Sequence, residues 1–156
     1  MDNKEKARIL STITKEQWEA IASLTQEQWE EVLNKSEGRI LESEKFDEDK
    51  ELKIKVMNIM KELGITANLK GYEYLIEAII CVYKDSSYKE ITKKLYPHIA
   101  NKFNTTFKNV ERSIRHAINK VFDENDADII DKYFSKEKCT NAEAIADLVN
   151  FVKFYQ

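Results

Sequence analysis

Glycine and proline are so scarce in this chain that its fold has little room for tight turns. The 156 residues include three glycines and one proline. Sheets and long functional loops rely on these residues for their turns, so their scarcity favours an all-α fold. The glycines, Gly38, Gly64 and Gly71, also fit neither a dinucleotide-binding fingerprint nor a P-loop. We therefore expect a helical protein without a glycine-rich cradle for phosphates.

Apolar residues at helical spacing divide the chain from residue 52 onward into short helices. Gly64 is the expected stop of the first helix, and Pro97 suits the first turn of the fourth. Asp126 is the expected N-cap of the next-to-last helix, and Thr140 or Asn141 that of the last. No segment has a convincing strand pattern. The predicted helices cover 52–63, 71–84, 87–95, 97–103, 107–122, 127–134 and 141–155.

An 11-residue repeat marks the N-terminal part of the chain, where TKEQWEAIASL is followed at once by TQEQWEEVLNK. Thr14 and Thr25 each precede a glutamine by three residues, which is a capping-box signature. The repeat predicts either two short helices or one continuous helix. The following residues, 36–50, are highly charged and weakly periodic, which indicates a linker. We therefore expect a helical appendage with its linker over 1–46 and a separate domain over 47–156.

Two tryptophans, Trp18 and Trp29, occupy equivalent places in the repeat. Burying such a side chain contributes about 1.5–3 kcal/mol, so we expect both to be covered. Three surfaces could bury them: the helical domain of the same chain, the same segment of a second chain, or a different protein. Trp18 and Trp29 are accordingly the candidate partner-binding residues.

Positive charge is concentrated in one block of an otherwise acidic chain. Residues 86–122 carry eight Lys or Arg and two Asp or Glu, whereas residues 1–50 carry eight and thirteen, and the whole chain has a net charge of −3. Such a block indicates a surface for a polyanion. The plainer interpretation is a solvated helix face. One role open to the acidic segment 1–50 is to lie against this basic block and compete with the polyanion for it.

The helices 97–103 and 107–122, joined by a tight polar turn, form a predicted helix-turn-helix. Phe107, Val110, Ile114, Ala117, Ile118 and Val121 fall on one face of the second helix, and long polar side chains fall on the opposite face. This is the arrangement of a recognition helix in the major groove. The predicted base-facing residues are Lys108, Asn109, Glu111, Arg112, Arg115, His116 and Asn119. The predicted phosphate contacts are Lys93, Lys94, Lys102, Thr105 and Thr106.

A family resemblance covers two thirds of the chain, from about residue 52 to 154. The segments ELGITANLKGYEYLIEAIICVY, ITKKLYPHIANKFNTT and NVERSIRHAI resemble the C-terminal DNA-binding effector domain of the master sporulation response regulator of endospore-forming Firmicutes. The resemblance implies a six-helix bundle with an embedded helix-turn-helix, which binds a short DNA box, often as a tandem pair. It also implies DNA contacts by Glu111, Arg112, Arg115 and His116.

Three departures from that family bear on function. The family arginine two residues before Glu111 is Asn109 here, and because asparagine prefers adenine edges, the recognised box is expected to differ at one position. The family couples this domain to a phosphoreceiver domain, but the first 50 residues show no alternation of strands and helices. The loop Ser135–Cys139 also looks shorter than its family counterpart, which belongs to the surface that engages RNA polymerase.

Other chemistry finds little support in the sequence. The run DENDAD at 123–128 lacks the glycine and the glutamate of a calcium loop and is better explained as a capped helix start. His98 and His116 are too far apart for a helical metal pair, and no cysteine accompanies them. Cys81 and Cys139 form no CxxC pair, and we expect them to be reduced thiols. We therefore expect no enzyme, no metal and no cofactor.

The sequence as a whole predicts a sequence-specific DNA-binding transcription regulator that acts on double-stranded DNA and lacks a phosphorylation switch. The alternative is a protein-protein interaction module, or an antagonist of a sporulation regulator, for which DNA binding is secondary. Homodimerisation on DNA and a protein partner for residues 1–46 are left open. Because the chain shows no signal peptide and no long apolar run, we expect a cytoplasmic, nucleoid-associated protein without a membrane contact.

Overall fold

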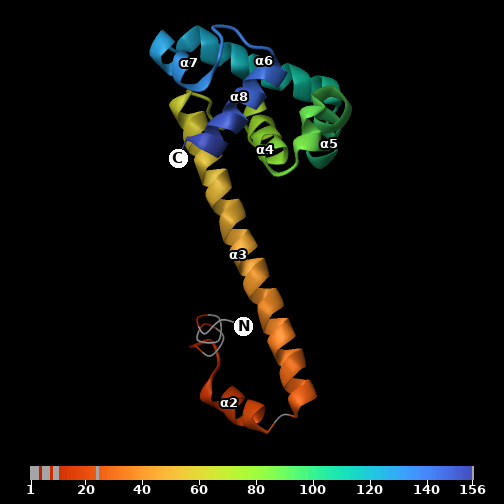
Figure 1. Ribbon diagram of the computed structural model, residues 1–156. Coiled ribbons are helices and arrows are strands. Elements are labelled where there is room, and N and C mark those ends of the chain that lie inside the picture. Colours follow the sequence, from red (N-terminus) through yellow and green to blue (C-terminus); the bar gives the residue numbers. More distant parts are fainter. Residues whose placement is uncertain (1–3, 5–7, 9–10, 24, 156) are drawn as a thin grey trace. The chain divides into compact units, whose positions relative to one another are not determined.

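The computed structural model describes residues 4, 8, 11–23 and 25–155, and for residues 18, 20–22, 36 and 40–43 it describes the backbone alone (Figure 1). The chain divides into two compact units, Met1–Asp49 and Lys50–Gln156. The described residues form helices and no strand, which confirms the all-α prediction. None of the helices in the described part of the chain combines the length and apolar character that crossing a membrane requires.

Two helices begin at the repeated threonines, as the first of the two alternatives predicts, but the second of them is long rather than short. Helix α2 spans Lys15–Ala22 and helix α3 spans Gln26–Glu62. The backbone N–H of Gln17 donates to Oγ1 of Thr14 at 3.3 Å, and the Gln17 side chain accepts from the Thr14 N–H at 3.0 Å. The same reciprocal pair recurs between Gln28 and Thr25. One continuous helix is therefore wrong, because Thr25 starts a new one.

The linker predicted over residues 36–50 is wrong, because these residues are part of helix α3. They are rich in glutamate, lysine and other strong helix formers and contain no proline. Gly38, the one glycine of the segment, costs only about 1 kcal/mol in a helix interior. Weak apolar periodicity made the segment look unstructured, but helix propensity does not depend on that periodicity.

The unit Lys50–Gln156 consists of the end of α3 and a series of shorter helices (Figure 1). Asn125 joins two of its helix ends, since its side-chain amide donates to the carbonyl oxygens of Leu63, at 3.0 Å, and Val121, at 2.9 Å. The predicted caps Asp126 and Thr140 are confirmed, and Thr140 forms a complete capping box with Glu143. The elements after α3 are α4 (Gly71–Lys84), η1 (Ser86–Lys89), η2 (Ile91–Leu95), α5 (Tyr96–Lys102), α6 (Phe107–Glu124), α7 (Ala127–Tyr133) and α8 (Asn141–Phe154).

The single helix predicted over 87–95 is also wrong. A 3-10 turn, η1, ends before Glu90, and a π-turn, η2, leads directly into α5. Within η2 the N–H of Leu95 donates to the carbonyl oxygen of Glu90, five residues earlier, at 3.4 Å. Pro97 has no N–H, and its ring clashes with the carbonyl four residues before it in a regular helix. The wider π-turn just before Pro97 accommodates both constraints.

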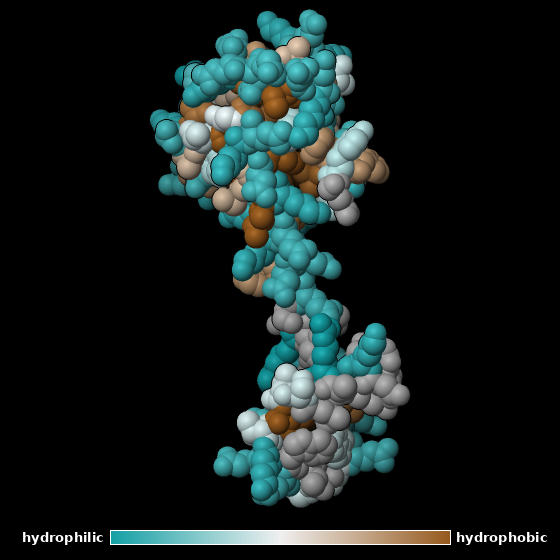
Figure 2. Space-filling view, turned by 90° about the vertical axis from the view of Figure 1, so that its left-hand side faces the viewer, coloured by the Kyte–Doolittle hydropathy of each residue, from teal (hydrophilic) through white to brown (hydrophobic). Residues whose placement is uncertain are grey.

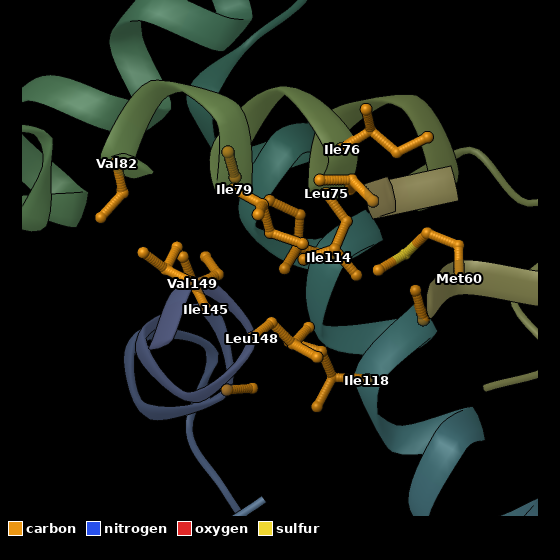
Figure 3. Close-up of a cluster of buried hydrophobic side chains, with 14 of the residues drawn as sticks. Met60, Leu75, Ile76, Ile79, Val82, Ile114, Ile118, Ile145, Leu148 and Val149 are labelled. Carbon is orange, nitrogen blue, oxygen red and sulfur yellow. The ribbon is translucent and has the colours of Figure 1, made fainter. Parts of the chain in front are cut away.

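Helix α4 lies at the centre of the core and packs against both α6 and α8. Leu75 and Ile79 of α4, Ile114 of α6 and Leu148 of α8 meet there with almost no exposed area (Figure 3). Met60, near the end of α3, reaches the same cluster and is completely buried. Hydrophilic residues cover most of the visible surface of this unit (Figure 2). The amphipathic pattern of α6 therefore finds its apolar partner in α4 and α8.

Candidate nucleic-acid interface

A short turn sets the angle between α5 and α6. The N–H of Phe103 donates to the carbonyl oxygen of Ile99 at 3.0 Å, and the N–H of Thr105 donates to that of Ala100 at 2.9 Å. Between them Asn104 has a φ of 51°, in the left-handed region that asparagine tolerates better than most residues. Thr106 then caps α6 by accepting the N–H of Asn109 at 3.3 Å. The predicted tight polar turn is thus present, and Thr106 at its end is the N-cap of α6.

The apolar face of α6 anchors the helix in the core. Val110, Ile114, Ala117, Ile118 and Val121 are buried, as predicted. Phe107, which was predicted on the same face, is 46% exposed. It is the first residue of α6, and the buried part of this face begins one turn later, at Val110. Phe107 therefore belongs to the apolar face by its spacing but not to the buried core.

The opposite face of α6 is exposed over most of its length. Asn109, Arg112 and Arg115 differ in how they are held on this face. The Arg112 side chain has no hydrogen bond or ion pair with any other described residue. In contrast, Arg115 pairs with the Glu111 carboxylate four residues earlier, and the Asn109 amide donates to Oγ1 of Thr105 at 3.3 Å. Lys108, Asn109, Arg112, Arg115, His116 and Asn119 are exposed, and Glu111 is half-buried.

The residues predicted to contact phosphate are in different local environments. Lys93 and Lys94 are exposed on η2. Lys102 is already engaged, because its ammonium lies 2.8 Å from Oε2 of Glu77 on α4. The hydroxyls of Thr105 and Thr106 accept hydrogen bonds from Asn109, so both threonines shape the start of α6.

Sequence reasoning missed two positions that hold α6 in place. Asn141, the one buried polar residue in the described core, donates to the Tyr96 hydroxyl at 3.0 Å and to the backbone oxygen of Glu111 at 3.1 Å. Gly71, the first residue of α4, lies so close to α6 that a Cβ there would be 2.3 Å from the backbone oxygen of Ser113. Glycine before an apolar helix is the one sequence signal for such a contact, and nothing in the sequence pairs Asn141 with α5 and α6.

A hollow beside α6 exposes further polar groups next to the predicted base-facing residues. Lys70 and Tyr74 line it from the start of α4, and Asn109 and Arg112 line it from α6. The Tyr74 ring packs edge-on against Phe103 of the turn, with the ring centroids 5.2 Å apart. The start of α4 is therefore part of the same surface as the exposed face of α6.

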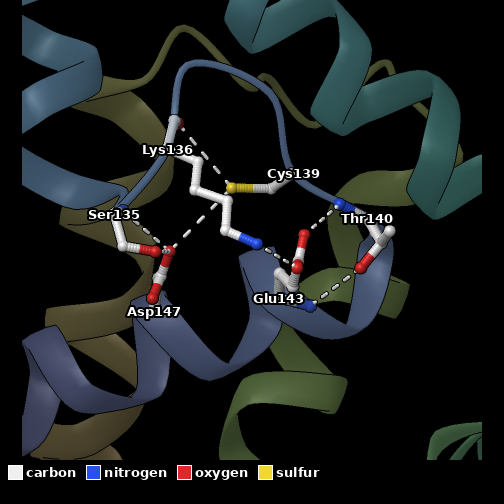
Figure 4. Close-up of polar contacts among 6 residues, drawn as sticks. All are labelled: Ser135, Lys136, Cys139, Thr140, Glu143 and Asp147. Carbon is white, nitrogen blue, oxygen red and sulfur yellow. Dashed lines mark hydrogen bonds and ion pairs between the residues drawn. The ribbon is translucent and has the colours of Figure 1, made fainter.

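The loop Ser135–Cys139, ahead of α8, is fixed by side chains of that helix (Figure 4). Asp147 accepts hydrogen bonds from both the backbone N–H and the hydroxyl of Ser135, each at 2.9 Å. Lys136 lies 2.6 Å from Glu143, and this ion pair holds the pKa of the Glu143 carboxyl below its ordinary value. The loop before α8 is therefore a well-bonded surface feature.

The N-terminal candidates are only partly described. Trp29 is half-buried on α3. The side chain of Trp18 lies outside the described residues, although its backbone is part of α2. The prediction that both rings are covered therefore stays a prediction.

One protein-family model matches the part of the chain that carries α6. The match covers the end of α3 and nearly all of the unit Lys50–Gln156, and it coincides with the region in which the sequence shows its family resemblance. Domains of this family are DNA-binding domains of a sporulation regulator rather than enzymes. Residues 56–152 match the family model described as the sporulation initiation factor Spo0A C terminal, and the chain therefore belongs to that family.

Proposed function

We propose that this chain is a sequence-specific transcription regulator that reads double-stranded DNA with the exposed face of α6. The observation that supports it best concerns the Arg112 side chain. This side chain is exposed in the middle of that face and makes no hydrogen bond or ion pair with any described residue. Arginine donates two hydrogen bonds to guanine in the major groove. Asn109, one turn earlier on the helix, supplies the side-chain amide that suits adenine. Such a role places the protein in the cytoplasm at the nucleoid.

The other residues around α6 suit different contacts with DNA. Lys108, Arg115, His116 and Asn119 are exposed at positions that suit base or backbone contacts. Glu111 orients Arg115 through their ion pair. Lys93, Lys94 and the threonines at the start of α6 suit phosphate contacts, and Lys102 joins them only if it leaves Glu77.

We also propose that DNA binding does not depend on phosphorylation. A phosphoreceiver domain alternates strands with helices, whereas the described part of residues 1–49 is helical. Treatment with small-molecule phosphodonors is therefore expected to leave the mass and the DNA affinity unchanged. A stoichiometric aspartyl phosphate that alters affinity would contradict this proposal.

The test of base reading compares two arginines. Arg112→Ala should lose about 1–3 kcal/mol of discrimination between the recognised box and scrambled DNA, which is the range for a good bidentate base contact. Arg39→Ala removes the same charge from an exposed position on α3 and should retain the discrimination. Fluorescence anisotropy over a salt series separates this loss from a general loss of charge. If Arg112→Ala discriminates as well as the unchanged protein, α6 does not read bases through Arg112.

The role of residues 1–46 is best tested by a truncation that begins near Asp47. The buried core begins at Leu52, so we expect the shortened chain to stay folded. A change from a dimer for the whole chain to a monomer for the shortened chain would show that the appendage, with Trp18 and Trp29, forms a homodimer. Tighter DNA binding at low salt would show that the acidic appendage competes with DNA. If the truncation changes neither, and neither chain binds any DNA specifically, the interaction module becomes the better explanation.

A further inference from the structure

Three metal-ligating side chains meet where α4 packs against α5. Glu77 and Cys81 lie one turn apart on α4, and His98 lies on α5. One ligand atom from each residue lies within 4.8 Å of the others. The sequence-based prediction that no cysteine accompanies His98 is wrong, because residues 17 positions apart, Cys81 and His98, are brought together by helix packing.

Two of the three distances between these atoms match a tetrahedral zinc site, and the third, between Cys81 and His98, is within 4.8 Å. Oε1 of Glu77 lies 3.4 Å from Sγ of Cys81 and 3.6 Å from Nε2 of His98. Zinc binds thiolate sulfur at about 2.3 Å and imidazole nitrogen or carboxylate oxygen at about 2.0–2.2 Å, which places tetrahedral ligands roughly 3.4–3.6 Å apart. The ligand atoms therefore need little movement to surround an ion.

The second oxygen of Glu77 is already supported. Lys102 lies 2.8 Å from Oε2 and holds the carboxylate in place, whereas Oε1 faces only the two other proposed ligands, Cys81 and His98. Burial favours the neutral form of Glu77, but hydrogen bonds from Lys102, Cys81 and His98 outweigh it and keep its pKa below the ordinary value. Once Cys81 and His98 bind an ion, the hydrogen bond from Lys102 is the one of these that remains, and such outer support of a ligating carboxylate is a regular feature of metal sites.

Burial and chemistry both limit the choice of ion. Cys81 is buried, whereas 38% of the His98 side chain is exposed, so solvent reaches one side of the cluster. A ligand set of sulfur, nitrogen and oxygen suits zinc better than magnesium or calcium, which prefer oxygen alone. On binding, a sulfur–metal bond replaces the S–H bond of Cys81, and the proton leaves to solvent.

We propose that Glu77, Cys81 and His98 form a three-ligand site for a thiophilic divalent cation such as Zn²⁺, with water in the fourth position. An ion there links α4 to α5, the helix that precedes the turn into α6. None of the three ligands is on α6, and the proposal does not depend on DNA binding.

The test is a titration of the whole 156-residue chain, stripped with a chelator and kept reduced by a phosphine. Co²⁺ is the probe, because thiolate ligation gives a near-ultraviolet charge-transfer band and tetrahedral geometry gives visible bands. We expect one Co²⁺ per chain, both sets of bands, and their loss when Zn²⁺ is added. The absence of a one-to-one complex with a thiolate band would overturn the proposal.

Matched variants show which residues bind the ion. His98→Gln should weaken Co²⁺ binding by at least about 10-fold, the lower end of the loss seen when even an outer hydrogen-bond partner of a ligand is removed. His116→Gln, which changes an exposed histidine on α6, should bind as the unchanged protein does.

A second pair of variants separates the two thiols. Cys81→Ser should lose the thiolate band, and Cys139→Ser should keep it. Because Cys81 is buried and its replacement can disturb folding, His98→Gln, at a half-buried position, decides the matter if Cys81→Ser is unstable. Equal affinity in His98→Gln and the unchanged protein, or loss of binding in His116→Gln or Cys139→Ser, would refute the assigned ligands.

Discussion

Replacing Gly71 with alanine tests the packing that positions α6. The added Cβ would lie 2.3 Å from the backbone oxygen of Ser113, 2.9 Å from its carbonyl carbon and 3.0 Å from Cβ of Ala117. Backbone atoms cannot swing aside as the end of a flexible side chain does, so α4 or α6 must shift. Overpacking of this kind typically costs about 1–3 kcal/mol, and occasionally more.

The opposing contribution is smaller. Alanine is favoured over glycine by about 1 kcal/mol in a helix interior, and Gly71 is only the first residue of α4. We therefore expect Gly71→Ala to lower the free energy of unfolding by about 1–3 kcal/mol. Each kcal/mol corresponds to a Tm lowered by roughly 4–8 °C in a domain of this size. Urea unfolding followed by far-UV circular dichroism measures the loss. DNA affinity should fall too, because the displaced Ser113 is next to Arg112.

Gly38→Ala is the matched control. No atom lies within 4 Å of a Cβ built on Gly38, which is inside α3. This variant should be as stable as the unchanged protein or slightly more stable. If Gly71→Ala and Gly38→Ala unfold at the same urea concentration, the close approach of α4 and α6 is wrong, and with it our account of how α6 is held.

Three further predictions follow from particular contacts. Asn141→Ala should lower the free energy of unfolding by about 1–3 kcal/mol in urea unfolding, because it leaves a backbone carbonyl of α6 without its buried donor; no loss would contradict this role. A hydrogen bond from Lys132, and a second from the Tyr133 hydroxyl, hold the pKa of Glu62 below its ordinary value. The stabilisation that they provide is therefore present above about pH 4.3 and is lost as the pH falls through the folded-state pKa. Thermal melts should therefore show the difference between the unchanged protein and Glu62→Gln shrinking on acidification, and a constant difference would refute the linkage. Phe107→Ala should cost far less than the roughly 3–5 kcal/mol of a buried phenylalanine, because its ring is 46% exposed, and a loss of that full size in urea unfolding would restore the buried interpretation.

The fold could be predicted where local signals coincide. In α6 an N-capping threonine, a strict apolar stripe and a polar stripe all indicate the same helix, and its central apolar residues, Val110 to Val121, are buried as predicted. The capping threonines of α2 and α3 were equally informative. Such signals are short-range, so the sequence alone displays them.

The errors arose where apolar periodicity was used to predict the backbone conformation. In 36–50 weak periodicity was interpreted as a lack of structure, although a charged helix needs no apolar stripe to form. Before Pro97 the periodic pattern concealed a 3-10 turn and, next to the proline, a π-turn that accommodates its missing N–H. Both cases show that apolar spacing predicts which face is buried more reliably than it predicts the backbone.

The site residues could likewise be predicted within one helix but not between helices. Residues on one helix, such as Asn109 and Arg112, could be assigned to one face by counting along the sequence. Contacts between helices could not, since the approach of Gly71 to Ser113 and the meeting of Cys81 with His98 depend on tertiary packing. These inter-helix contacts position α6 and create the proposed metal site.

Selection of bound sequences from random double-stranded DNA, with the unchanged protein and with Asn109→Arg in parallel, tests the central claim most directly. If α6 reads bases from its exposed face, both proteins enrich a short box, and the two boxes differ at one position, with adenine for Asn109 and guanine for the arginine variant. The other positions, including the one read by Arg112, stay the same. Enrichment of no sequence, or of the same box by both proteins, would contradict the claim that this face of α6 reads DNA.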